Sequence, residues 1–293
     1  MLTRNYFILL YCLIWLASCG SEYAQEQEEE IKGLENYDQL ENNEKTIKYA
    51  VNQCFSVPSP FENVEYFSKS IPSFEYKTSV FDTANTSSKK YQFPFLGLVI
   101  SDLAFTTEFN TTKDSSLLQA KCQTFKNILK DFNVKDTQCD SIQLFYADAI
   151  STEILSTDFT LFMNQLKGES KYEESAQVLM GSWTGVSYSL FESAGDFGNR
   201  PDLEKLILEQ LNLYIHLNSM LKTFETEESN DFLIQFKEIE KTVDQLAYQL
   251  NDFEMENTTE GLVLKGGKSY EFTASSYVEL KRKLKNLRNL ILS

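Results

Sequence analysis

Apolar residues recur at helical spacing over most of the chain from about residue 37 onward. In the clearest stripe the intervals alternate between four and three residues, which predicts one long helix with an N-cap signal at Asn230-Asp231. Its members are Phe232, Phe236, Ile239, Val243, Leu246, Leu250 and Phe253. Only three heptads with phenylalanine in the seam favour packing within the chain over a coiled-coil partner.

Similar stripes predict helices over residues 115–132 and 201–224, and a last helix whose apolar positions run from Tyr277 to Ile291. Apolar runs at 95–105 and 176–191 add to this pattern. Strand signals are sparse: residues 76–81, and residues 262–264, which lead into a predicted turn at 265–268. The predicted fold is all-α, a single multi-helix bundle or array of about eight to ten helices over residues 37–293.

The first nineteen residues predict where the protein is located. Arg4 precedes an apolar run at residues 7–16, and Leu16-Ala17-Ser18-Cys19 follows at once. This is the layout of a secretory signal peptide, and it is too short for a membrane span. The four-residue ending resembles the lipobox of bacterial lipoproteins, in which residues 1–18 are removed and Cys19 receives the lipid. A plain secreted protein and an uncleaved anchor helix are the alternatives.

The residue after the cysteine is Gly20 and not aspartate, which by analogy with known sorting favours the outer membrane. Residues 19–36 form a glutamate-rich tether with little to bury. Such a stretch resembles a surface-display signal of some Gram-negative groups, but any tether must be polar. The sequence therefore leaves the periplasmic and the surface-facing side both open.

Charge excludes some partners. Without the leader, which contains Arg4 and no acid, 275 residues carry 26 Lys and Arg against 43 Asp and Glu. Because phosphates are bound by basic surfaces, this acidic balance argues against binding of nucleic acid and against electrostatic binding to anionic lipid. We expect membrane contact only through the lipid on Cys19. The charged face of the last helix (Lys281, Arg282, Lys283, Lys285 and Arg288) is interpreted as solvated, with docking of an acidic partner as the alternative.

Few residues suit metal or nucleophile chemistry. His216 is the one histidine, within a helical stripe, and is interpreted as structural. Cys54, Cys122 and Cys139 remain after processing, so at most one intramolecular disulfide can form. Cys122 lies on an apolar stripe and is expected to be buried. No cofactor, metal site or catalytic residue is predicted.

A ligand pocket is the one site that the pattern indicates. Asp102 is an acid within an apolar run, so it must be paired, hydrogen-bonded or protonated. The GSWTG segment at 181–185 has its serine in the second place and is therefore no nucleophile turn. Its small residues indicate close helix packing or room for a ligand. The predicted pocket comprises Gly97, Asp102, Gly181, Trp183, Gly185 and Tyr188.

Four segments together resemble a family of helical lipoproteins of the Gram-negative outer membrane: residues 55–62 (FSVPSPFE), 96–104 (LGLVISDLA), 180–188 (MGSWTGVSY) and 199–221. The family usually reads LGVYGADL and GGWIEGLY, so this chain departs at Val99, Ser101 and Thr184. The resemblance implies an all-helical fold and an envelope location, and it implies no activity. Residues 58–62 are explained without a ligand as a helix entry, with Ser59 as the cap and Pro60 in the first turn.

These observations predict a non-catalytic role in binding, in scaffolding or as an accessory subunit, with an envelope protein or a small ligand as partner. The alternative is a carboxylate-based hydrolase acting on envelope or extracellular glycans. Such an enzyme needs two acids roughly 5–10 Å apart in a cleft, with Asp102 as the first candidate.

Overall fold

The computed structural model describes residues 57–71, 91–109, 115–132, 134, 151–223, 230–258 and 261–293. These residues belong to the unit Val51–Ser293 and contain eight helices and one two-stranded antiparallel sheet. The predicted all-α class is confirmed. The predicted signal peptide, the tether with Cys19, Cys54, Cys139 and the strand predicted at 76–81 lie outside the described residues.

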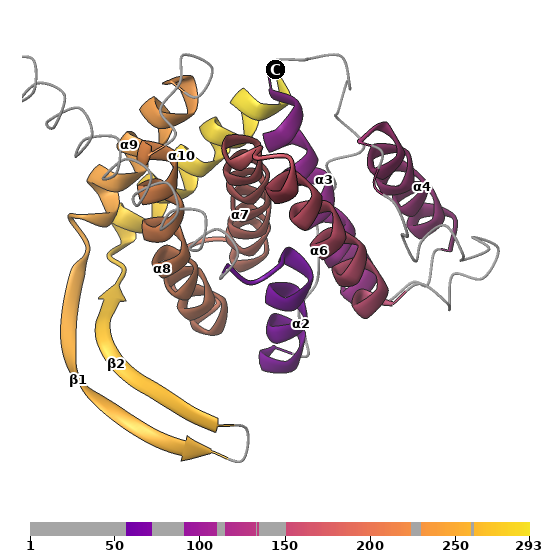
Figure 1. Ribbon diagram of the computed structural model, residues 1–293. Coiled ribbons are helices and arrows are strands. Elements are labelled where there is room, and N and C mark those ends of the chain that lie inside the picture. Colours follow the sequence, from indigo (N-terminus) through magenta and orange to yellow (C-terminus); the bar gives the residue numbers. More distant parts are fainter. Residues whose placement is uncertain are drawn as a thin grey trace, which may run out of the picture. The chain divides into compact units, whose positions relative to one another are not determined.

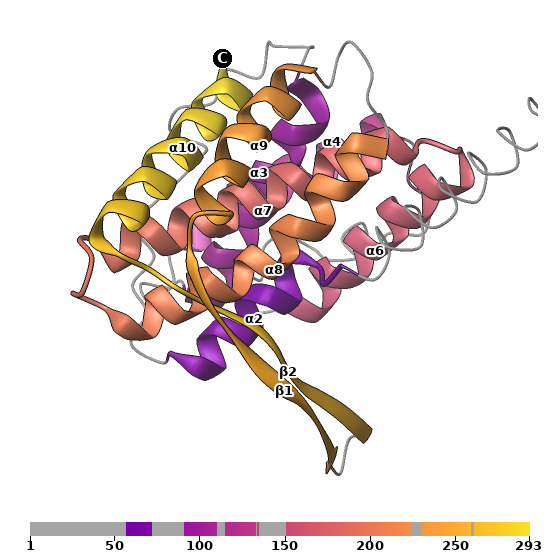
Figure 2. The ribbon, with the colours of Figure 1, turned by 90° about the vertical axis from the view of Figure 1, so that its left-hand side faces the viewer.

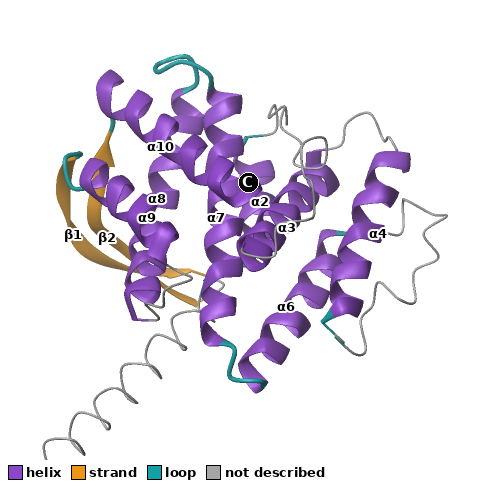
Figure 3. Ribbon diagram, turned by 90° about the horizontal axis from the view of Figure 1, so that it is seen from above, coloured by secondary structure: helices purple, strands orange, loops and turns teal. Residues whose placement is uncertain are grey.

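Two helices that are buried on nearly every side form the centre of this unit: the apolar α3 (Gln92–Phe109) and α7 (Tyr172–Ala194), which also buries several serines. Both are buried over most of their length, as expected for helices without a polar face. Figures 1 and 3 show α7 between α3 on one side and α8 (Pro201–Thr223) on the other. Helix α3 begins at Gln92 and has Pro94 in its first turn, where a missing N–H costs little.

The remaining helices cover this pair. Helix α2 (Pro60–Ser70) packs against α3 and α6 (Thr152–Gly168), and α4 (Ser115–Asp131) packs against α3. Helix α10 (Ala274–Leu292) packs against α7 and α9 (Asn230–Val243). The helices predicted over 115–132, over 201–224 and at the end of the chain are confirmed.

Local chemistry sets the start of α2 as predicted. The Ser59 hydroxyl accepts a hydrogen bond from the Glu62 amide at 3.1 Å, and the Ser59 amide donates to Glu62 Oε2 at 2.7 Å. This reciprocal pair is a capping box, and Pro60 occupies the first turn, where its missing N–H costs nothing. The Ser59 and Ser156 hydroxyls, 3.2 Å apart, also link this cap to α6.

The long helix predicted over the 232–253 stripe is wrong beyond Val243. There α9 ends in a tightened turn, in which the Leu246 amide donates to the Val243 carbonyl at 3.1 Å. Leu250 and Phe253 instead lie in strand β1 (Ala247–Thr258). Ladder pairing with strand β2 (Gly261–Glu271) competes successfully with the helical period, and the Tyr248 and Tyr270 rings, 6.3 Å apart, join the two strands.

The strand predicted at 262–264 is confirmed within β2, but the turn predicted at 265–268 is wrong. Gly267 pairs with Asn251 and Lys265 pairs with Glu254, so two residues of β1 face the single residue Gly266. The glycines therefore mark a bulge in the ladder and not a reversal of the chain. Figures 1 and 2 show both strands running away from the helices.

The basic residues of α10 do not form one solvated face. Lys281 Nζ donates to the carbonyls of Phe191 and Gly195 at 3.1 and 3.3 Å, at the carboxyl end of α7. Lys283 is buried and donates to the Glu238 carbonyl and, at 2.7 Å, to the Thr242 hydroxyl of α9. Cations are favourable at helix carboxyl ends, so these two lysines join α10 to its neighbours. Arg282 and Lys285 remain exposed.

Candidate functional site

The three glycines of the predicted pocket lie where α3 and α7 touch. A Cβ atom on Gly97 would lie 2.1 Å from the Val178 carbonyl oxygen, and one on Gly181 would lie 1.9 Å from the Pro94 carbonyl oxygen. At Gly185 it would lie 1.9 Å from the Ser101 hydroxyl. The space beside these glycines is therefore filled by the opposite helix, which is the close-packing interpretation of the small residues.

Trp183 points to the other side of α7. Its indole nitrogen donates to the Gln210 carbonyl at 2.9 Å, and its ring centroid lies 5.2 Å from that of Tyr214 on α8. The buried indole thus satisfies its one polar group, as buried tryptophans generally do. Trp183 joins α7 to α8 while the glycines join α7 to α3.

Asp102 forms a buried ion pair. Its Oδ2 accepts from Lys121 Nζ of α4 at 2.6 Å, and both side chains are 1% exposed. The same Nζ donates to Thr106 Oγ1 at 2.7 Å. Because a buried charge needs a partner and satisfied hydrogen bonds, this arrangement explains an acid inside an apolar helix. Of the three alternatives that the sequence left open for Asp102, the structure shows pairing, and the partner comes from the next helix.

Tyr188 and Arg288 extend this polar region toward α10. The Arg288 guanidinium carbon lies 4.9 Å from the Tyr188 ring centroid, a cation–π contact. Burial lowers the pKa of Arg288, and the nearby Tyr188, Asp102 and Glu192 oppose that shift. Burial, followed by the Glu192 charge, raises the pKa of Tyr188. Asp102 and Tyr188 therefore act on a common cation that the pocket prediction did not include.

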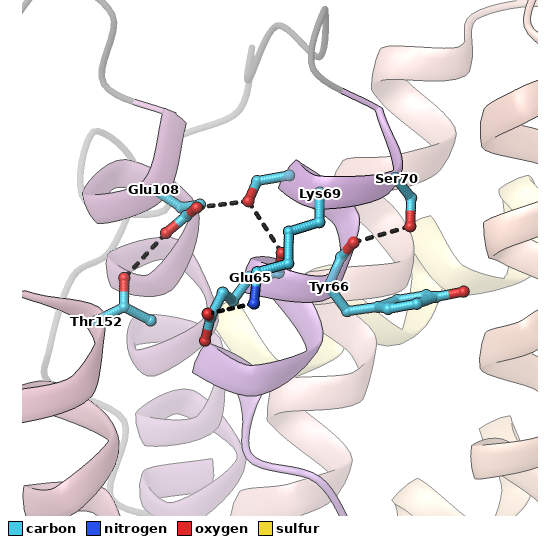
Figure 4. A network of polar contacts seen from close by, with 7 residues as sticks. Glu65, Tyr66, Lys69, Ser70, Glu108 and Thr152 are labelled. Carbon is cyan, nitrogen blue, oxygen red and sulfur yellow. Dashed lines mark hydrogen bonds and ion pairs between the residues drawn. The ribbon is translucent and has the colours of Figure 1, made fainter. Parts of the chain in front are cut away.

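Glu108, near the carboxyl end of α3, joins three helices. Its two carboxylate oxygens accept hydrogen bonds from Ser68 of α2 and, at 3.0 Å, from Thr152 in the first turn of α6. Figure 4 shows Glu108 between these two helices, with Glu65 and Lys69 forming a separate surface pair. The Glu108 carboxylate therefore links α3 to α2 and α6.

A cavity of about 180 Å³ lies between α2, α6 and α7. Val57, Phe159, Met163 and Leu179 form its apolar wall, and Ser59, Glu62, Thr160 and Asn164 form its polar wall. An engineered cavity of about 150 Å³ binds benzene, so this volume suits a molecule of that size. It is larger than a second space, of about 10 Å³, that lies beside it.

Two of the segments behind the family resemblance meet beside this cavity. A narrower space shares Val57 and Leu179 with it and is also lined by Pro58, Ser182 and Trp183. The described part of the first segment, residues 57–62, and the 180–188 segment are thus neighbours in the fold. The interpretation of residues 58–62 as a helix entry is confirmed, but it gave no indication that Ser59 and Glu62 also line a cavity. The α6 residues of the cavity carry no signal in the sequence.

The residues considered for metal and nucleophile chemistry are dispersed. His216 is exposed on α8. Among the described residues, no group of three or more His, Cys, Asp or Glu side chains is placed to hold a metal ion. Cys122 is a free, buried thiol on the inner side of α4, as the apolar stripe predicted.

Cys122 is expected to resist alkylation in the folded protein. Burial raises the pKa of its thiol to about 12, against a weaker opposing effect of Lys126. Only the thiolate reacts, so a pKa this high lowers the reactive fraction at pH 8 by roughly a thousandfold. Peptide mass spectrometry after iodoacetamide treatment should show Cys122 modified in urea and unmodified in buffer. Equal rates in both conditions would contradict the buried position.

Comparison with known proteins adds no assignment: no family model, curated protein or solved structure matches this chain. No helix among the described segments is long and apolar enough to cross a membrane.

Proposed function

We propose that this protein is a lipid-anchored component of the cell envelope, held at the outer membrane through Cys19, whose helical unit has a non-catalytic binding role. The ligand or partner binds at the cavity between α2, α6 and α7. The proposal includes that the protein belongs to the helical lipoprotein family that its four segments resemble. The signal-peptide layout supports the location.

The burial of Asp102 is the observation that carries the choice of binding over hydrolysis. A carboxylate-based hydrolase needs two acids that converge on a cleft. Asp102, the first candidate acid, is 1% exposed and bound to Lys121. Glu62 is the one acid among the described residues that line the α2–α6–α7 cavity. The geometry therefore favours a site that holds a ligand without cleaving it.

The lipid anchor is tested by growing cells with radiolabelled palmitate. The wild-type protein should incorporate the label and sediment with membranes, whereas the Cys19→Ser variant should do neither. Cys54→Ser is the matched control and should be labelled like wild type. Equal labelling of wild type and Cys19→Ser, or no labelling of either, would refute the anchor.

The binding role is tested by native mass spectrometry of the acylated protein, extracted gently from its own membrane. A retained protein subunit indicates an envelope assembly, and a retained small mass indicates an occupied cavity. Either result supports the proposal. A bare monomer at every detergent concentration, together with hydrolysis of envelope glycan by the purified protein, would favour the enzyme instead.

A further inference from the structure

We infer that the α2–α6–α7 cavity binds a small organic cation, a primary ammonium group carried on an apolar body about the size of one aromatic ring. This inference rests on the proposed binding role and adds the chemical class of the ligand. It rests on the negative charge of Glu62 in the cavity lining and on the presence of both polar and apolar residues in that lining.

The charge of the wall has one sign. Among the described residues that line the cavity, Glu62 is the single ionisable one, and none is a lysine, arginine or histidine. The Glu62 carboxylate accepts a hydrogen bond from the Ser59 amide through Oε2, and it makes no ion pair among the described residues. A carboxylate beside a partly enclosed space attracts cations and repels anions.

The capping box strengthens this selectivity. A helix amino terminus ordinarily attracts an anion, because its free amides point outward. At α2 the Ser59 hydroxyl and the Glu62 carboxylate already occupy that position. A phosphate or carboxylate ligand would therefore have to displace Glu62, whereas an ammonium group can bind to it directly.

The polar wall offers the acceptors that an ammonium group requires. Such a group has three N–H donors and no acceptor. Besides Glu62, the wall has the Asn164 amide oxygen and the Thr160 hydroxyl, whose own proton is donated to the Ser156 carbonyl at 2.9 Å. The Thr160 oxygen therefore retains its lone pairs for a ligand. The lining thus offers one acceptor for each of the three donors, from exposed side chains of α2 and α6.

The apolar wall sets the rest of the ligand. Phe159 and Met163 of α6 and Leu179 of α7 line the cavity and are buried. Phe159 is held by an edge contact with Phe61, at 6.4 Å between ring centroids. A volume of about 180 Å³ accommodates one ring.

The test is a ligand-observed NMR titration of the full-length acylated protein with benzylammonium chloride, and with benzyl alcohol as the neutral analogue. For so small a ligand we expect saturation with a Kd on the order of 1 mM. Benzyl alcohol should bind at least roughly tenfold more weakly, because it lacks the charge-assisted hydrogen bond to Glu62.

Three variants locate the site. Glu62→Gln keeps the capping box, since glutamine serves in that motif, but removes the charge, so benzylammonium should bind about tenfold more weakly. Thr160→Trp fills the cavity from the exposed face of α6 and should abolish binding. Glu65→Gln removes an acid from α2 outside the cavity and should bind like wild type.

Absence of saturable benzylammonium binding to the wild type, or unchanged affinity in Glu62→Gln, would overturn the inference. Equal binding of the alcohol and the ammonium would overturn it as well. These failures leave palmitate labelling and a partner retained in native mass spectrometry unaffected. Failure of the cation site is therefore distinct from failure of the proposed function.

Discussion

Replacement of Gly181 by alanine should destabilise the helical unit by about 3 kcal/mol, the upper range for overpacking a core. The added Cβ would lie 1.9 Å from the Pro94 carbonyl oxygen and 2.7 Å from its carbon, so α3 and α7 must move apart. Backbone on both sides leaves no side chain that can rotate away. The measurement is a urea titration followed by circular dichroism, in which the midpoint should fall sharply.

Gly168→Ala is the matched control for that substitution. Gly168 lies in the last turn of α6, and no atom lies within 4 Å of an added Cβ. Because alanine is the better helix former by roughly 1 kcal/mol, this variant should be as stable as wild type or more so. A Gly181→Ala midpoint equal to that of Gly168→Ala would mean that α3 and α7 do not touch at this point.

Gly185→Ala separates backbone contact from side-chain contact at the same interface. The obstacle there is the Ser101 hydroxyl at 1.9 Å, which belongs to a side chain. Ser101→Ala removes that oxygen and leaves its Cβ at 3.0 Å. The double variant should therefore recover part of the stability that Gly185→Ala loses, whereas Ser101→Ala should not rescue Gly181→Ala.

Lys121→Met should destabilise the protein by about 3–5 kcal/mol, the usual result of removing one partner from a buried ion pair. The substitution keeps most of the apolar stem but leaves the Asp102 carboxylate without its 2.6 Å partner. Thr106 does not replace it, because its hydroxyl donates to the Asp102 backbone carbonyl at 2.8 Å. Urea unfolding measures the loss.

The double variant Asp102→Leu, Lys121→Met should recover most of that loss, because well-packed apolar residues often replace a buried ion pair without net cost. Recovery should be incomplete, since Arg288 also interacts with the Asp102 charge. If Lys121→Met alone unfolds within about 1 kcal/mol of wild type, the carboxylate must reach water in the folded state.

The local features of the sequence were sufficient wherever the deciding contacts lie within a few residues. The cap at Ser59 and Glu62 spans three residues, and the first turn of α8 begins at Pro201 as predicted. The apolar stripe of α4 likewise predicted the burial of Cys122. Such contacts depend on one helix and one face, and the spacing of residues along the chain contains both.

The hairpin shows where this kind of reasoning fails. Leu246, Leu250 and Phe253 continue the stripe of α9, yet Leu250 and Phe253 lie in a strand. The pairing that decides between the two states joins residues up to 24 positions apart, such as Ala247 and Glu271. The spacing of apolar residues along the chain contains no information about a distant partner strand. A short apolar run is therefore compatible with a helix or with a strand.

By itself, the sequence determined the helical class, the starts of α2, α4 and α8, and the acidic charge, because each depends on neighbouring residues or on composition. Only the tertiary structure decided what the small and charged residues do. Gly97 and Gly181 admit the backbone of the opposite helix, Asp102 binds Lys121, and Glu62 lines a cavity with residues of α6. Each partner comes from another helix, and no spacing along one helix specifies which surfaces meet when the helices pack.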